Sequence, residues 1–313
     1  MEIIRLTGDT VLTEPCVATI GFFDGVHRGH RFLIKQVTDE AFMQGRRSAV
    51  ITFDRHPRQV VKTDYRPLLL STFREKMTLL STTGVDYCIV LPFDEQMASL
   101  SAHDFMEKIL LNRLHVKTLV TGYDNRFGHN RSEGFEDYVE YGKHMGMKVV
   151  QAKPFLFNGI HVSSSVVRSF LQNGEIELAN SCLDYEYSFT GTVVAGEQIG
   201  RSIGFPTANI QPEDAHKLIP AHGVYAVRAH LGYTGEAHPA MMNIGHRPTF
   251  NGQQDTIEVN LLHFSGNLYD EQLCVSFVGK LRDEQRFNNG VELARQLHID
   301  ADAAEKVLAA SKI

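Results

Sequence analysis

The sequence has few cysteines and no close pair of them. Among its 313 residues only four are cysteines, and they are far apart: Cys16, Cys88, Cys182 and Cys274. Zinc knuckles and redox motifs usually need a CxxC pair, so this spacing argues against both. Isolated cysteines are typical of small buried side chains in a reducing compartment, and we therefore expect a cytoplasmic protein.

The chain also lacks long apolar runs and an excess of positive charge. It contains no run of apolar residues long enough to span a bilayer, and its N-terminal stretch Met1–Pro15 is not a basic segment followed by an apolar one. The formal net charge of −6 argues against a broad nucleic-acid-binding surface. We expect neither a membrane nor a nucleic acid among the partners.

The glycine-rich sequences best known for binding phosphate are missing as well. The chain has no GxxxxGK[ST] and no GxG, so neither a P-loop nor a dinucleotide-binding fingerprint applies. A different arrangement of glycines stands out instead, in the stretch GFFDGVHRGH at residues 21–30.

The first half of the chain alternates strand-like and helix-like segments. Short apolar runs rich in β-branched residues are typical of strands covered on both faces, and five occur, at residues 16–22, 48–53, 86–91, 116–122 and 147–152. One helical pattern carries Phe32, Leu33, Val37 and Ala41 on one stripe and should end at Gly45. Helices that repeatedly follow strands predict βαβ units and a parallel sheet.

Two further helix starts are visible in this half. Thr72 and Glu75 have the spacing of a capping box, and Gly84 should close that helix. Ser101 should begin another helix, before the sequence FMEKILLNRL.

The second half, from about Asp184, has a different period. Strand-like segments separated by turn residues follow one another until residues 291–313, which return to helical composition. This pattern predicts a mainly antiparallel barrel or sandwich with a C-terminal helix. The change of period alone places a domain boundary between residues 1–183 and 184–313.

The stretch GFFDGVHRGH follows a strand-like run and opens a helical one. Helix N-termini bind anions, glycines let a phosphate approach the backbone, and imidazoles beside them can donate hydrogen bonds. His27 and His30, taken singly, are more often ordinary surface or core residues. The spacing HxGH after a strand reverses those odds, because it resembles the signature of the nucleotidyltransferase superfamily, which transfers a nucleoside monophosphate and releases pyrophosphate.

A second signature of that superfamily lies late in the domain, at a helix start. The segment 163–179 fits it, because its serines can cap the helix and bind phosphate while Arg168 reaches a triphosphate. An ordinary cap with a solvated arginine is the alternative. Between the two signatures lies a polar, glycine-rich loop at residues 121–134, where such folds bind ligands.

The barrel half contains a second group of polar residues. In GEQIGRSIGFPTANI (196–210), Thr207 and Asn209 lie two apart on an extended chain and should face the same side. Hydroxyl and amide oxygens suit Mg²⁺, although such a turn is often only a turn. Glu258 is the carboxylate of the apolar strand 256–264, where a solvent-facing position is about equally expected.

Together these strings make the chain similar to the bacterial bifunctional riboflavin kinase/FMN adenylyltransferase family, over nearly its whole length. FDGVHRGH, TFDRHP, GYDNRFG and SSSVVR resemble the adenylyltransferase half in order, and GRSIGFPTANI, GVYAV, NIGHRPTF, IEVNLLHF and LRDEQRF resemble the kinase half. The resemblance implies a nucleotidyltransferase-type α/β domain and a riboflavin kinase barrel. It implies riboflavin, FMN and ATP as substrates, with Mg²⁺.

The resemblance also implies roles for single residues. The catalytic set comprises Glu258 as general base of the kinase, and His27 and His30 on ATP phosphates in the adenylyltransferase. The residues expected to hold ATP and its phosphates are Gly21, Phe22, Asp24, Gly29, Ser164, Ser165, Arg168, Gly200 and Gly204. Those expected near the flavin or in the substrate loop are Asp124, Arg126, Arg282 and Phe287. Thr207 and Asn209 would take the metal.

Three residues depart from the pattern of the family. Asn125 stands where Phe is common, and Asn260 and His263 stand where His and Asp are frequent. Asn125 bears on the flavin side of the first site, while the other two flank Glu258 without replacing it.

Two other functions compete with this interpretation. One is a different HxGH adenylyl- or cytidylyltransferase whose barrel is regulatory, against which the PTAN string and Glu258 argue. The other is a non-catalytic flavin carrier or a nucleic-acid-binding barrel, whose nucleic-acid version the acidic charge balance disfavours. The sequence leaves the oligomeric state open.

Overall fold

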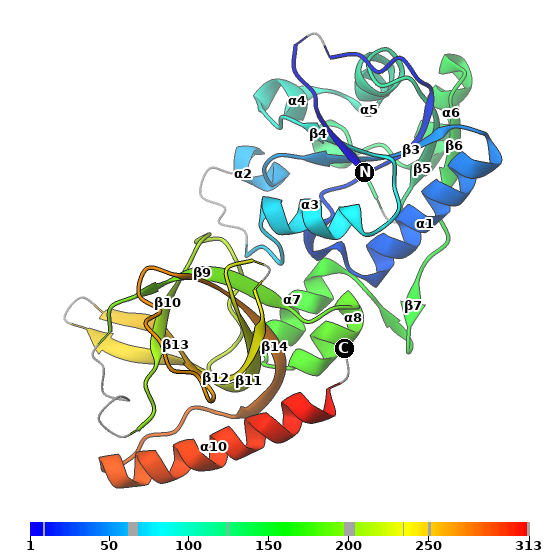
Figure 1. Ribbon diagram of the computed structural model, residues 1–313. Helices are drawn as coiled ribbons and strands as arrows, with labels where there is room; N and C mark the ends of the chain where they lie inside the picture. Colours follow the sequence, from blue (N-terminus) through cyan, green and yellow to red (C-terminus); the bar gives the residue numbers. More distant parts are fainter. Residues whose placement is uncertain are drawn as a thin grey trace. The chain divides into compact units, whose positions relative to one another are not determined.

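A computed structural model describes residues 1–8, 10–61, 68–123, 125–196, 204–233, 235–249 and 252–311. The chain forms two compact units, Met1–Ser164 and Ser165–Ile313. Figure 1 labels their helices and strands.

The first unit is built on a six-stranded parallel sheet with the strand order β1-β4-β3-β2-β5-β6. Its strands are β1 (Glu2–Arg5), β2 (Cys16–Ile20), β3 (Arg47–Phe53), β4 (Tyr87–Leu91), β5 (Val116–Thr121) and β6 (Lys148–Gln151). The five predicted strands and the parallel sheet are confirmed. The edge strand β1 was not predicted, because its four residues are mostly exposed and too few to show a pattern.

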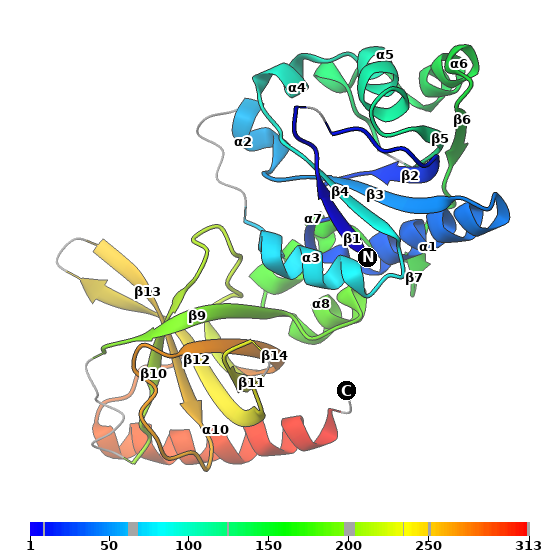
Figure 2. The same cartoon turned by 45° about the horizontal axis from the view of Figure 1, so that its top comes forward.

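Helical segments connect these strands and cover the sheet on both faces (Figures 1 and 2). They are η1 (Asp24–Val26), α1 (Arg28–Met43), α2 (Pro57–Val61), α3 (Phe73–Ser81), α4 (Glu95–Ser99), α5 (Ala102–Asp104), the π-helix η2 (Phe105–Leu111), η3 (His129–Arg131) and α6 (Phe135–Met145). A small hairpin, β7 (Leu156–Phe157) and β8 (Ile160–His161), follows β6.

The alternation of side chains along β2 explains the two covered faces. Ala18 and Ile20 pack with residues of α5, η2 and α6. Val17 points the other way and packs with Val37 and Ala41 of α1. A strand buried on both faces is expected to be largely apolar, and β2 carries one polar residue, Thr19, among its five buried positions.

The helix boundaries follow the predicted signals closely. Thr72 Oγ1 accepts a hydrogen bond from the Glu75 amide at 3.2 Å, and the Glu75 carboxylate accepts one from the Thr72 amide at 2.8 Å, so the capping box is confirmed. Gly45, just beyond α1, has a left-handed φ of 60°. The predicted stripe of α1 omitted Ile34, which is fully buried, while Phe32 and Leu33 are only half-buried.

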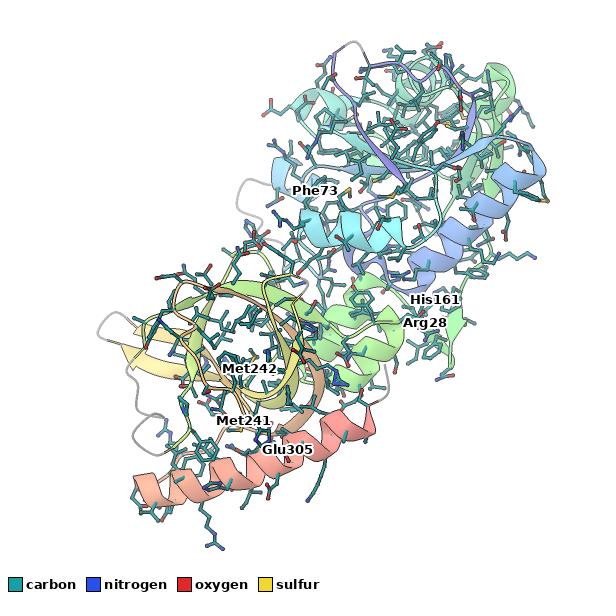
Figure 3. All side chains as sticks on the ribbon, in the orientation of Figure 1. Arg28, Phe73, His161, Met241, Met242 and Glu305 are labelled. Carbon is teal, nitrogen blue, oxygen red and sulfur yellow. The ribbon has the colours of Figure 1, made fainter. Side chains whose placement is uncertain are left out.

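The second unit contains a closed antiparallel barrel in the order β10-β13-β12-β11-β14-β9. Its strands are β9 (Ser188–Val194), β10 (Ala208–Pro212), β11 (Gly223–Leu231), β12 (Ala237–Thr249), β13 (Gly252–Leu261) and β14 (Gln272–Arg282). The barrel and the C-terminal helix, α10 (Gly290–Ala310), are confirmed. In Figure 3, Met241 and Met242 mark β12: Met241 packs with Ala304 of α10, and Met242 is buried on the other side of the strand.

The helical segment expected at residues 163–179 is two helices, α7 (Ser164–Gln172) and α8 (Ile176–Leu183). Gly174, with φ at 76°, separates them. Asn180 joins α8 to the barrel, because its Nδ2 donates to the Phe277 carbonyl at 2.8 Å and its Oδ1 accepts from the Tyr187 amide at 2.8 Å. Both helices thus fall almost wholly in the barrel unit, and the functional division at 183/184 remains a prediction.

Within the part of the chain described above, no helix combines the length and the apolar character that crossing a membrane would need.

Candidate functional site

The loop between β2 and α1 has an unusual backbone. Phe23, Gly25 and Val26 have φ values of 56°, 76° and 37°. Positive φ is costly for a β-branched residue such as Val26, and strained backbone of this kind concentrates at functional sites. The chain therefore leaves β2 two residues earlier than predicted and turns sharply before the helix begins.

His27 and His30 lie together at the start of α1. Their rings stack at 3.6 Å between centroids with 17° between planes. His27 is the N-cap, and its Nδ1 accepts a hydrogen bond from the His30 amide at 3.3 Å. A Cβ on Gly29 would lie 3.0 Å from the Val162 carbonyl oxygen and 3.2 Å from the His27 ring, so glycine permits this close approach. The arrangement combines two imidazoles with the positive end of a helix.

Hydrogen bonds of Asp24 hold this loop in place. Its buried carboxylate accepts hydrogen bonds from the Leu70 and Ser71 amides at 3.0 Å, and Ser71 Oγ accepts one from the Gly25 amide at 3.0 Å. The Asp24 carbonyl also accepts the Ser164 hydroxyl at 3.0 Å. Ser164 is thereby joined to the histidine loop, so the two segments that resemble nucleotidyltransferase signatures contact each other. A direct contact between Asp24 and ATP stays a prediction.

The remaining residues expected in the first site are placed as follows. Gly21 donates its amide to the Ile51 carbonyl at 3.0 Å, and Arg126 is exposed on the loop after β5. Ser165 and Arg168 follow Ser164 in α7. Asp124 lies outside the described residues. Their roles stay predictions.

The departure at Asn125 has a structural explanation. Its Nδ2 donates to the Ile20 carbonyl at 2.6 Å, which joins the loop after β5 to the carboxyl end of β2. Asn125 therefore lacks the ring that phenylalanine would offer, but its amide makes a hydrogen bond that joins the ends of the neighbouring strands β2 and β5.

In the barrel, three polar residues share one row across adjacent strands. Asn209 of β10 pairs in register with Glu258 of β13, and Glu258 pairs with Asn243 of β12. Residues directly opposite in antiparallel strands project from the same face. Thr207 Oγ1 donates to Glu258 Oε2 at 3.4 Å, so the predicted base and both predicted metal ligands come together. Sequence reasoning missed Asn243, whose only signal is the strand register.

Gly196 fits closely against this row. A Cβ on Gly196 would lie 2.0 Å from Asn209 Nδ2, so a larger residue there would push the Asn209 amide aside. Gly204 is exposed with φ at 86°, and Gly200 lies outside the described residues.

The two other departures have separate partners. The Asn260 Nδ2 donates to the Pro206 carbonyl at 2.7 Å, which fixes the chain directly before Thr207. His263 has its Nε2 2.6 Å from Glu305 Oε1 on α10. Asn260 thus contacts the segment that carries Thr207, whereas His263 contacts the C-terminal helix.

Arg282 is held by a buried carboxylate that sequence reasoning missed. Asp300 of α10 is only 2% exposed and receives the Arg282 Nε at 2.9 Å and an Nη at 2.7 Å. The Phe287 ring centroid lies 5.8 Å from the guanidinium carbon. This bidentate pair fixes Arg282 at the end of β14, and its contact with flavin stays a prediction.

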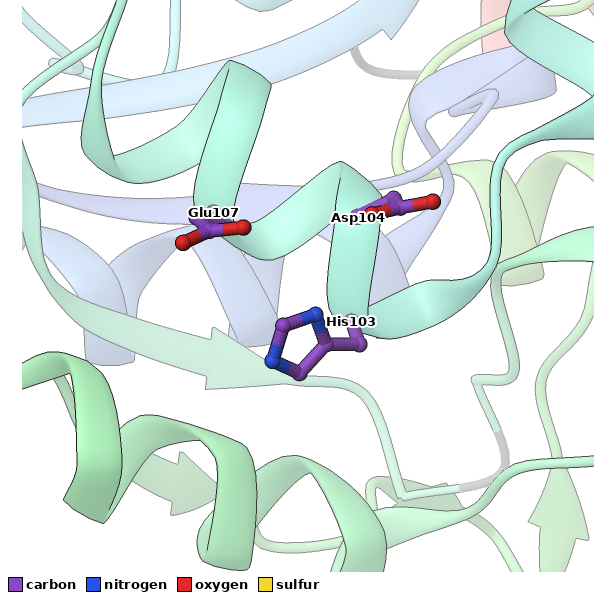
Figure 4. Close-up of side chains that lie close together, drawn as sticks. All are labelled: His103, Asp104 and Glu107. Carbon is purple, nitrogen blue, oxygen red and sulfur yellow. The ribbon is translucent and has the colours of Figure 1, made fainter.

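A different group of potential metal ligands lies on α5 and η2. His103, Asp104 and Glu107 bring one ligand atom each to within 4.8 Å of one another (Figure 4). Lys108 Nζ already pairs with Asp104 at 3.1 Å, and the imidazole is exposed and lies edge-on to Tyr141. None of the residues predicted for either site belongs to this group.

Two family models match successive parts of the chain. The model of the FAD synthetase family matches residues 10–166, and that of the riboflavin kinase family matches residues 183–308. The first match contains the histidine loop, and the second contains the row of Glu258.

Full-length relatives combine both parts. The bifunctional riboflavin kinase/FMN adenylyltransferase of Escherichia coli K12 is 37% identical over 299 residues, covering 96% of this chain and 95% of the relative. The protein of the same name from Bacillus subtilis is 35% identical over 298 residues, covering 92% and 91%. A crystal structure from Streptococcus pneumoniae, described as a macrolide-efflux protein, is 28% identical with a TM-score of 0.87 and covers 97% and 98%. The chain belongs to the family of bifunctional riboflavin kinase/FMN adenylyltransferases.

Proposed function

We propose that the chain carries out the two reactions of this family at two separate sites, one around the histidine loop and one around Glu258. The barrel phosphorylates riboflavin to FMN with ATP, and the α/β unit adenylylates FMN to FAD with release of pyrophosphate. The observation that carries the proposal is the position of the two family matches: the first contains His27, His30 and Ser164, and the second contains Thr207, Asn209 and Glu258.

In the kinase reaction the nucleophile is neutral. The ribityl 5′-hydroxyl of riboflavin attacks the γ-phosphorus of ATP, a new O–P bond forms, the bond to ADP breaks, and the hydroxyl proton must leave. Glu258 is half-buried and positioned by Thr207, so it is the group proposed to take that proton. Asn209 and Asn243 lie on either side of it to orient substrate groups.

In the adenylyl transfer the nucleophile is already an anion. The FMN phosphate attacks the α-phosphorus of ATP and the bond to pyrophosphate breaks, so no base is required. The site must hold two anions together and stabilise the charge that spreads over the phosphoryl oxygens. The paired histidines at the start of α1 suit that task, with Ser164 as a further phosphate contact.

Mg²⁺ is proposed to accompany ATP. The hydroxyl of Thr207, the amide of Asn209 and the nearby carboxylate of Glu258 offer the oxygen ligands that Mg²⁺ prefers. Bound there, the ion would neutralise phosphate charge. A cytoplasmic location is proposed from the cysteines, all four of which are thiols.

The function is tested by mixing the protein with riboflavin, ATP and Mg²⁺ and following the flavins by chromatography. We expect FMN first and FAD second. A parallel reaction is supplied with FMN in place of riboflavin. If FAD forms there but riboflavin yields no FMN, the result would favour a nucleotidyltransferase with a regulatory barrel. Flavin binding without either product would favour a carrier.

A further inference from the structure

Lys76, in the first half of α3, is a buried lysine that the proposed mechanism does not use. It is 3% exposed. Its Nζ donates to the Phe22 carbonyl, to Thr52 Oγ1 and to the Phe53 carbonyl, each at 3.2 Å. The three protons of an ammonium group thus meet three neutral oxygens.

Two of these contacts converge on the residue that opens the histidine loop. Thr52 Oγ1 itself donates to the Phe22 carbonyl at 3.1 Å, and Lys76 Nζ lies 4.1 Å from the centroid of the Phe22 ring. Phe73, labelled in Figure 3, provides a second ring 5.7 Å away. Lys76 therefore holds Phe22 by both its main chain and its ring.

The segment that leads into α3 holds the other end of the same loop. Leu70 and Ser71 bind the Asp24 carboxylate, as described above, and they directly precede the N-cap Thr72. Phe22 and Asp24 are thus both fixed from the side of α3. Between them lies Phe23, whose left-handed backbone needs such support.

Burial brings the pH range in which this lysine loses its proton closer to neutral. Desolvation lowers the pKa of Lys76 to about 8, against the opposing influence of Asp24, Cys88 and Asp54. Burial also raises the pKa of the Cys88 thiol to about 11, so Cys88 is uncharged where Lys76 titrates. The neutral amine has only two protons, and its lone pair would face one of the three oxygens.

We propose that Lys76 is a positioning residue of the adenylyl-transfer site, whose ammonium fixes Phe22 and thereby the loop that carries His27 and His30. The inference rests on the proposed function of that loop. Lys76 reaches the substrates only through the loop, and the protonated form is the one that holds it.

The proposal predicts a loss of adenylyl transfer at alkaline pH. The kcat/KM for FMN adenylylation should decline as the pH rises through about 8, because this parameter reports the free enzyme. The decline in kcat should lie at higher pH, because bound phosphates favour the ammonium. The kcat/KM for phosphorylation of riboflavin by the same chain should not decline when Lys76 loses its proton.

Three variants of the full-length chain test the proposal. Lys76→Met keeps the length of the side chain and removes its charge. Thr52→Val removes one hydrogen bond to the ammonium and one to the Phe22 carbonyl, and it keeps the shape of a buried side chain. Lys35→Met, on the exposed face of α1, is the matched control for loss of a lysine.

We expect Lys76→Met to lower kcat/KM for FMN adenylylation by about 10- to 100-fold at pH 7 and to abolish the alkaline decline, with kinase activity unchanged. Thr52→Val should shift the decline to lower pH by about one unit. Lys35→Met should resemble the wild type in both activities.

An alkaline decline that persists in Lys76→Met would overturn the proposal. If Lys76→Met does not fold, the pH profile of kcat/KM for FMN adenylylation in Thr52→Val decides. A profile with the same alkaline decline as the wild type would also overturn the proposal. A wild-type protein that makes no FAD from FMN at any pH would remove the proposed function itself, a failure distinct from a wild type that is active but whose pH profile does not depend on Lys76.

Discussion

The two candidate sites use different parts of the chain for similar phosphoryl chemistry. The first is a bent loop at a strand–helix junction, held by buried polar contacts from Asp24, Ser71 and Lys76. The second is a row of side chains on a regular ladder, in which Glu258 has a polar neighbour on each side. In the proposed mechanism this difference follows the nucleophile, because an anionic phosphate needs positioning whereas a neutral hydroxyl also needs a base.

The largest expected effect is that of Glu258→Gln. Glutamine keeps the shape of the side chain but takes no proton near neutral pH. We expect the kcat of riboflavin phosphorylation to fall by roughly 10²–10⁴-fold with little change in riboflavin affinity, measured by steady-state kinetics and calorimetry. FAD formation from supplied FMN is the internal control. A kcat near that of the wild type would remove Glu258 from the catalytic residues.

His30→Ala probes the other side of the comparison. The variant removes one of the two stacked imidazoles at the start of α1. FAD formation from FMN should fall by about 10²–10³-fold, as for the loss of one charge-stabilising donor, while FMN formation from riboflavin stays unchanged. Equal loss of both activities in a folded variant would show that the two sites are not independent.

The next effect concerns where the kinase unit begins. A fragment of residues 184–313 is expected to keep kinase activity, but it lacks α8, whose Ile176 and Leu183 are buried and whose Asn180 binds β14 and Tyr187. A fragment of residues 165–313 should therefore be more stable by about 3 kcal/mol or more. Urea unfolding of the two fragments measures the difference. If the two fragments had equal urea midpoints and equal dependences of the unfolding free energy on urea, α8 would contribute nothing to the stability of the barrel.

The smallest expected effect is that of Gly196→Ala. The added Cβ would collide with Asn209 Nδ2 and displace it from the row beside Glu258. We expect kinase kcat/KM to fall about tenfold, in line with the cost of overpacking, and adenylyl transfer to be unaffected. Gly8→Ala, where a Cβ meets no neighbour within 4 Å, is the matched control. Wild-type kinase activity in Gly196→Ala would mean that the position of Asn209 matters little.

Local patterns in the sequence were enough for much of the fold. The apolar runs gave five of the six parallel strands, and the capping box at Thr72 begins α3 as predicted. The helix expected after Ser101 is largely π-helical, with the Asn112 amide bonded to the Glu107 carbonyl at 3.0 Å. That change of hydrogen-bond pattern has no signature in residue periodicity.

Candidate residues could be predicted where they stand in a recognisable sequence motif. Residues that join a site only through contacts with distant parts of the chain could not be predicted. His27, His30 and Glu258 stand in recognisable strings. Asn243 joins Glu258 only through the strand register, and Asp300 meets Arg282 only once α10 packs on the barrel. Such partners are set by tertiary packing, which a single sequence does not display.

The central claim is that FMN is made at one site and consumed at another. The most direct measurement mixes two full-length variants, Glu258→Gln and His30→Ala, with riboflavin, ATP and Mg²⁺. Each variant alone should form little FAD, since one makes FMN very slowly and the other adenylylates it very slowly. The mixture should form FAD readily, because FMN released by His30→Ala is a substrate for Glu258→Gln. A mixture that forms no more FAD than the two variants measured separately would contradict the account.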